Sequence, residues 1–179
     1  MHNGELHSSD RQMAPRQRGF TLIEVLVAVL VLAIGLLGIA GLQAAGLQMN
    51  NSAYQRSQAA ALTQDMADRA RANTEGYQSG AYNVGDPTTG LSETASCFTT
   101  GGCSSTQMAQ SDVARWRATV QSLLPGGEGT ICQDASPDDG TSETSPACSG
   151  SGNYVIKIWW TDDREGGDKH RYETEIRAL

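Results

Sequence analysis

Histidine, cysteine, serine and acidic side chains are the residues that could do chemistry in this sequence. Its three histidines are His2 and His7 near the N-terminus and His170 in a polar segment near the C-terminus. None of these histidines supplies the catalytic base of a Ser-His-Asp or Cys-His arrangement. The paired glycines at 101–102 and 126–127 have the sequence context of turns and not of a phosphate-binding loop. We therefore predict no catalytic residue and no enzymatic activity.

The four cysteines all lie in the second half of the chain: Cys97, Cys103, Cys132 and Cys148. In an exported domain, an even number of cysteines indicates disulfides, and two disulfides allow three pairings. We favour Cys97 with Cys103 and Cys132 with Cys148, because each pair closes a short loop rich in Gly, Ser, Thr and Asp that has little apolar content of its own. A zinc site is the alternative, and the lack of paired histidines counts against it.

Two acidic clusters could collect a calcium ion. They comprise Asp138 with Asp139, and Asp162 and Asp163 with Glu165 and Asp168. Neither cluster follows the spacing of a helix-loop-helix calcium site, and a solvated loop is the simpler interpretation. We expect no metal ion and no cofactor, and calcium binding by these loops stays an open alternative.

A single carboxylate stands in the most apolar stretch of the chain. Between residues 20 and 55 the only formal charge is Glu24, and every residue from 25 to 42 is aliphatic or glycine. About 20 apolar residues suffice to cross the hydrocarbon core of a bilayer, which is about 30 Å thick. An acidic residue at the centre of such a helix costs about 2.5–3.5 kcal/mol, and less near its end. Glu24 therefore needs a specific role.

Charge placement predicts how this segment lies in a membrane. Arg11, Arg16 and Arg18 precede the apolar run, and the next positive residue is Arg56. The positive-inside rule then keeps the N-terminus in the cytoplasm and exports the remainder. The apolar run continues into residues 43–48 without the small-x-small cleavage site of an ordinary secretory signal.

The net charge of −7 argues against binding to nucleic acid.

The segment Arg18-Gly19-Phe20-Thr21-Leu22-Ile23-Glu24-Val25 resembles the class III signal of type IV prepilins and pseudopilins. The resemblance implies that a dedicated prepilin peptidase cuts between Gly19 and Phe20 and that the new N-terminus at Phe20 is methylated. It also implies three parts: a leader (1–19), a membrane and filament-core helix (20–47), and an exported domain (48–179). A plain membrane anchor with an incidental glutamate is the alternative.

The resemblance also implies a role for Glu24 in filament assembly. In a bundle of packed helices, the nearest cation is the methylated Phe20 amine of the neighbouring subunit. A buried carboxylate that meets this ammonium recovers much of the cost of burial, and the pair would set the register between subunits. Before assembly, Glu24 can also lie at the membrane interface.

The remaining sequence predicts the elements that follow the membrane segment. No proline or glycine interrupts residues 48–71, so the helix should continue through them and stop at residues 73–76. A heptad-spaced stripe of Met49, Ala53, Ala60 and Ala67 should face the exported domain. A second amphipathic helix is expected at 112–124, with Ser111 as its N-cap.

Three strands are predicted at 129–132, 153–161 and 171–178, the last two as an antiparallel hairpin. Alternation places Tyr154, Ile156, Ile158 and Trp160 on one face of the second strand, with Lys157 and Trp159 on the other. Trp159 and Trp160 are adjacent and therefore point to opposite faces of the strand. We expect one of them in the core and the other either over the packed helix or exposed to a partner subunit. The fold class is α+β, the pilin lollipop, in which a long N-terminal helix packs on a small antiparallel sheet.

Segments 32–38, 112–116, 123–129 and 154–162 resemble the minor pilins called type IV pilus modification protein, PilV. This implies a minor pilin in the pilus or its initiating tip complex. Its partners would be other minor and major pilins, the prepilin peptidase, the inner-membrane assembly platform and inner-membrane lipid. The alternative is a minor pseudopilin of type II secretion. An anchored adhesin or DNA-uptake receptor is a different class, and the acidic charge disfavours DNA.

Overall fold

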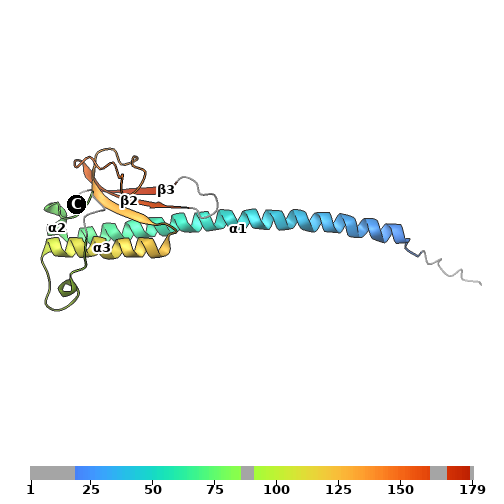
Figure 1. Cartoon of the computed structure of the whole chain (residues 1–179), viewed down its shortest axis with the longest axis horizontal. Coiled ribbons are helices and arrows are strands. Elements are labelled where there is room, and N and C mark those ends of the chain that lie inside the picture. The colour runs from blue at the N-terminus through green and yellow to red at the C-terminus, as the bar shows by residue number, and fades with distance from the viewer. Residues whose placement is uncertain (1–18, 86–90, 162–168, 178–179) are drawn as a thin grey trace, which may run out of the picture. The chain divides into compact units, whose positions relative to one another are not determined.

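The order of elements is helix, short helices and a C-terminal antiparallel sheet. The computed structural model describes residues 19–85, 91–161 and 169–177. Its elements are α1 (Leu22–Ala72), α2 (Thr74–Gln78), the 3₁₀ turn η1 (Ala95–Phe98), α3 (Ser105–Leu123), β1 (Glu128–Asp134), β2 (Asn153–Trp160) and β3 (His170–Ile176) (Figure 1). The contacts divide the chain into two units, Met1–Gly46 and Leu47–Leu179, and α1 contributes a half to each.

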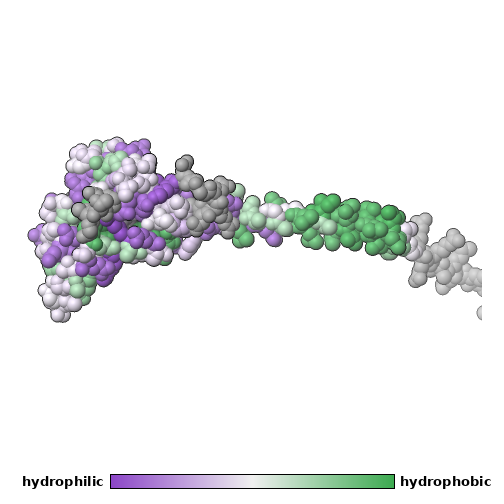
Figure 2. Space-filling view, viewed as in Figure 1, coloured by the Kyte–Doolittle hydropathy of each residue, from purple (hydrophilic) through white to green (hydrophobic). Residues whose placement is uncertain are grey.

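The first unit contains the apolar half of α1. Thr21 caps this helix, since its backbone carbonyl accepts the N–H groups of Glu24 and Val25 at 3.1 and 3.3 Å, and its hydroxyl lies 3.4 Å from the Glu24 nitrogen. Hydrophobic side chains cover the visible face of this part of the helix (Figure 2), and residues 20–42 are all exposed. By length and composition α1 could cross a membrane, as expected from its sequence.

The second unit is built on a three-stranded antiparallel sheet in the order β1-β2-β3. Opposite residues include Ile131 with Ile156 and Ile158 with Tyr172. The predicted hairpin of β2 and β3 is confirmed, while β1 is longer than the predicted 129–132. The α+β class is also confirmed, because the C-terminal half of α1 shares one hydrophobic core with this sheet.

The predicted contact stripe of α1 is wrong at Met49 and Ala53, whereas Ala60 is half-buried and Ala67 is buried as predicted. Met49 is 73% exposed and Ala53 is also exposed, whereas the buried residues follow a spacing of three and four: Ala59, Leu62, Met66 and Ala70. At about 20° of drift per heptad the predicted stripe stays on one side of the helix, but that side is the edge of the buried face and not its centre. The buried part also starts only at Gln55, where the exported domain begins to cover the helix.

Helix α3 begins about two turns earlier than predicted, at Ser105. Ser104 is its N-cap and forms a capping box with Gln107, so the expected cap, Ser111, lies buried inside the helix. There the Ser111 hydroxyl accepts the backbone N–H of Thr94 at 2.9 Å. The buried Trp116 then joins α3 to α1, since its indole N–H donates to the Leu62 carbonyl at 2.8 Å.

The two faces of β2 are both buried. Tyr154, Ile156, Ile158 and Trp160 belong to the main core, as their alternation predicted. Lys157 and Trp159 on the other face are also completely buried, because the segment between β1 and β2 folds back over the sheet and bonds to Lys157. Neither tryptophan is exposed, which contradicts the interpretation that one of them is available to a partner.

Candidate functional site

The residues of the predicted processing signal lie at the start of α1. Gly19 and Phe20 precede the helix, and the Phe20 side chain is 83% exposed. Glu24 is in the first turn, where a carboxylate interacts favourably with the positive end of the helix dipole. The leader residues 1–18 lie outside the described part of the chain, so the structure includes only Gly19 on the N-terminal side of the proposed cleavage point.

Glu24 lies beside a shallow groove along one side of the helix. Its lining residues recur every three to four positions: Phe20, Glu24, Val25, Ala28, Val29 and Leu32. All except Glu24 are apolar. Within the described ranges, no basic side chain forms an ion pair with the Glu24 carboxylate. This surface can therefore bury an apolar helix and receive one positive charge from outside.

Both disulfides fasten loops of the second unit. Cys97 bonds to Cys103 around η1, and Cys132 of β1 bonds to Cys148 in the segment before β2. This is the pairing that the two loop lengths favoured. The first loop is also held to α3, since the Arg115 guanidinium lies 3.7 Å from the Phe98 ring centroid and pairs with Glu93 at 2.8 Å.

A buried polar cluster holds α1 to the elements that follow it. The Tyr82 hydroxyl donates to Asp112 Oδ2 at 2.7 Å and accepts the Asn73 amide at 3.2 Å. Burial and the hydrogen bond to Asp112 hold the pKa of Tyr82 well above its usual range. Arg69 approaches the other oxygen of Asp112 at 3.6 Å. Each polar group in this cluster is used in packing, which gives the cluster a structural role.

The histidines and acidic residues that were considered for catalysis or metal binding do not form a site among the described residues. His170 is not in a loop, as the sequence suggested, but is the first residue of β3, where its ring lies 5.6 Å from that of Trp160. In the part of the chain that the structure describes, no group of three His, Cys, Asp or Glu residues could hold a metal ion. Asp138 and Asp139 lie between β1 and β2. The other acidic cluster, Asp162, Asp163, Glu165 and Asp168, falls outside the described residues.

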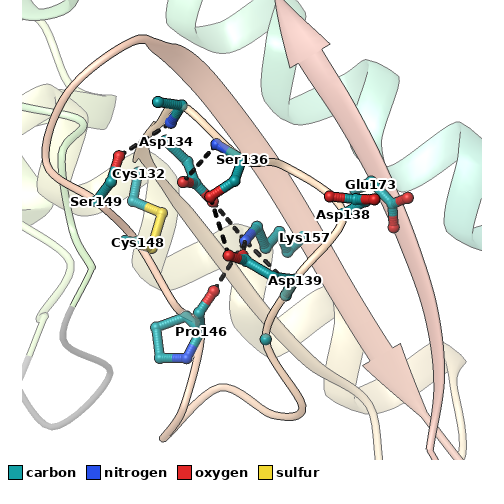
Figure 3. Close-up of polar contacts among 12 residues, drawn as sticks. Cys132, Asp134, Ser136, Asp138, Asp139, Pro146, Cys148, Ser149, Lys157 and Glu173 are labelled. Carbon is teal, nitrogen blue, oxygen red and sulfur yellow. Dashed lines mark hydrogen bonds and ion pairs between the residues drawn. A yellow bond between two sulfur atoms is a disulfide. The ribbon is translucent and has the colours of Figure 1, made fainter.

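Sequence reasoning missed the role of Lys157. Its ammonium pairs with Asp134 at 2.6 Å and Asp139 at 2.8 Å, and the side chains of Lys157 and Asp134 are fully buried (Figure 3). One signal was present, since a lysine in the middle of the apolar strand 153–160 must either reach solvent or find a buried partner. The sequence does not say which acid is that partner, because Asp134 is 23 residues away.

Comparisons with known families bear on both units. Residues 14–40 match the prokaryotic N-terminal methylation motif, and residues 41–114 match the type IV pilin family Tt1218. No curated protein and no solved structure matches the chain. The two matched regions adjoin and include the whole of α1, with Glu24 in its first turn and Gly19 and Phe20 just before it. The chain is therefore a type IV pilin with a prepilin methylation motif, a subunit of a pilus or a pseudopilus.

Proposed function

We propose that the chain is a minor pilin of the PilV type, incorporated into a type IV pilus or into the complex that initiates it. The observation that carries the proposal is the lone carboxylate of Glu24 in the apolar half of α1. All residues from 20 to 42 are exposed in the single chain, and Glu24 is the only charged one among them. Such a surface is stable only in lipid or against other apolar helices, and its single charge requires a cation.

In this proposal the helix moves from one apolar environment to another. The prepilin peptidase cleaves between Gly19 and Phe20 and the Phe20 amine is methylated, while α1 spans the inner membrane with the disulfide-bonded domain in the periplasm. On assembly, α1 leaves the lipid and packs against the helices of neighbouring pilins, and Glu24 accepts their N-terminal ammonium. Because apolar burial is similar before and after, little hydrophobic free energy opposes the transfer in either direction.

Mass spectrometry of the protein from its native host tests the processing step. The expected mature chain begins at a methylated Phe20, and a chain that begins elsewhere contradicts the proposed cleavage. Assembly is tested separately with Glu24→Ala, which should be inserted and cleaved normally but should be depleted from purified filaments. Glu24→Asp is the matched control, because it keeps the charge on a shorter side chain. Normal incorporation of Glu24→Ala would remove Glu24 from the assembly mechanism.

A minor pseudopilin of a type II secretion system is the second candidate function, since the same apolar helix and signal serve both assemblies. Deletion of the gene distinguishes the two. Loss of surface pili with normal protein secretion supports the minor pilin, whereas a secretion defect with normal piliation supports the pseudopilin.

A further inference from the structure

Four oxygen atoms surround the buried ammonium of Lys157. They are Asp134 Oδ2 at 2.6 Å, Asp139 Oδ1 at 2.8 Å, the Pro146 carbonyl at 2.9 Å and the Asp139 carbonyl at 3.1 Å (Figure 3). We call these four atoms the Lys157 cage. An ammonium has three N–H donors. The four acceptors of the Lys157 cage therefore outnumber the donors by one.

The loop holds the cage oxygens through hydrogen bonds of its own. The Ser136 N–H donates to the second oxygen of Asp134 at 3.1 Å, and the Ser136 hydroxyl donates to the second oxygen of Asp139 at 3.0 Å. The disulfide from Cys132 to Cys148 closes the same loop. The carboxylates are therefore oriented by the loop as well as by the lysine.

Both carboxylates carry charge at neutral pH. Burial alone would raise the pKa of Asp134, but the hydrogen bonds from Lys157 and from the Ser136 N–H outweigh it and leave the pKa below its ordinary value. The hydrogen bond from Lys157 also lowers the pKa of Asp139. One ammonium faces two carboxylates, so the cage itself retains an excess negative charge.

Carboxylates and backbone carbonyls are the oxygen ligands that calcium prefers in proteins, at about 2.3–2.6 Å. We propose that the segment from Asp134 to Pro146 is a cation-binding loop whose cation is supplied by the chain itself, as the ammonium of Lys157, and that removal of this ammonium turns the cage into a calcium site. The native loop then needs no free metal ion to stay on the sheet. This inference is independent of whether the chain serves a pilus or a pseudopilus.

The Lys157→Ala variant tests the proposal in the full chain, purified in detergent. Without the ammonium, the buried Asp134 carboxylate loses its partner and the Asp139 side chain, which is 42% exposed, loses the same one, which destabilises the folded state until a dication neutralises the two charges. Thermal unfolding is followed by tryptophan fluorescence in EDTA, in about 10 mM calcium and in about 10 mM magnesium. For a site with a dissociation constant of about 1 mM, calcium should raise the Tm of the variant by about 3–6 °C over EDTA.

Two controls define the result. The wild-type protein should unfold at the same temperature in EDTA and in calcium, because its cage is occupied. The double variant Lys157→Ala/Asp139→Asn should lose the calcium response, since it lacks one of the two charged ligands. Magnesium should have a smaller effect than calcium, because it requires shorter distances and near-octahedral geometry. An equal response of wild type and Lys157→Ala, or no response of either, overturns the proposal.

A second variant covers the case in which Lys157→Ala does not fold in EDTA. Lys157→Thr also removes the ammonium, and its β-branched side chain suits the central strand. For either variant, recovery of soluble folded protein after refolding in calcium but not in EDTA supports the proposal. Failure of both variants to fold in either condition counts against it, because a site able to bind calcium should have restored the fold.

Discussion

Gly129 lies in β1, directly against the Trp116 ring of α3. A methyl group added at this residue would lie 2.5 Å from Trp116 Cη2 and 2.7 Å from Trp116 Cζ3, well inside van der Waals contact. Both residues are fully buried, so neither the strand nor the indole can move outward into solvent. Overpacking in such a core costs about 1–3 kcal/mol, and we expect Gly129→Ala to reduce the free energy of unfolding by that amount.

The Trp116 ring should account for most of this cost. Trp116→Phe deletes the two ring atoms that the new methyl group would contact, at the expense of a cavity and of the hydrogen bond to the Leu62 carbonyl. The double variant should therefore be more stable than the sum of the single effects predicts, with a coupling of at least about 1 kcal/mol. Urea unfolding of the detergent-solubilised protein, followed by fluorescence of the remaining Trp159 and Trp160, measures all three variants.

Gly101→Ala is the matched control. The nearest atom to its added methyl group would be Thr99 Oγ1 at 3.5 Å, an ordinary contact. We expect this variant to be within about 0.5 kcal/mol of wild type or slightly more stable, because alanine restricts the unfolded chain. The steric reasoning is refuted if Gly129→Ala behaves like Gly101→Ala, or if the effects of Gly129→Ala and Trp116→Phe simply add.

Ser104→Ala removes the N-cap of α3 and should cost about 0.5–2 kcal/mol of stability in the same urea assay. Its control, Ser122→Ala, loses an exposed hydroxyl in the last turns of α3 and should be nearly neutral. Equal effects of the two variants would contradict the capping role. Stability should also fall as the pH drops below 3.8, the ordinary pKa of aspartate, since the folded-state pKa of Asp134 lies lower than this. This contribution is fully present above that pH and is lost as the carboxylate binds a proton, so Asp134→Asn should lose less stability between pH 5 and pH 2 than wild type does. An unchanged pH profile in Asp134→Asn would exclude Asp134 as the responsible group.

Sequence patterns predicted the elements whose physics is local. The length and uniform apolar character of residues 25–42 required a long helix in an apolar environment. The Tyr, Val, Ile and Trp content of residues 153–161 predicted the strand, and the two-residue period of a strand assigned its side chains to two faces. The start of α3 was missed for a local reason as well. The box formed by Ser104 and Gln107 was present in the sequence, but the amphipathic pattern begins later and suggested Ser111 instead.

The sequence by itself determined that the chain has an apolar helix with one acid near its start and an α+β domain after it. These follow from composition and period, because each depends only on neighbours along the chain. The tertiary structure decided which face of α1 is buried, that Trp159 and Trp160 are both inside, and that Lys157 finds Asp134. These depend on residues that are distant in sequence and meet only after the loop between β1 and β2 folds over the sheet, where a buried charge must find its partner.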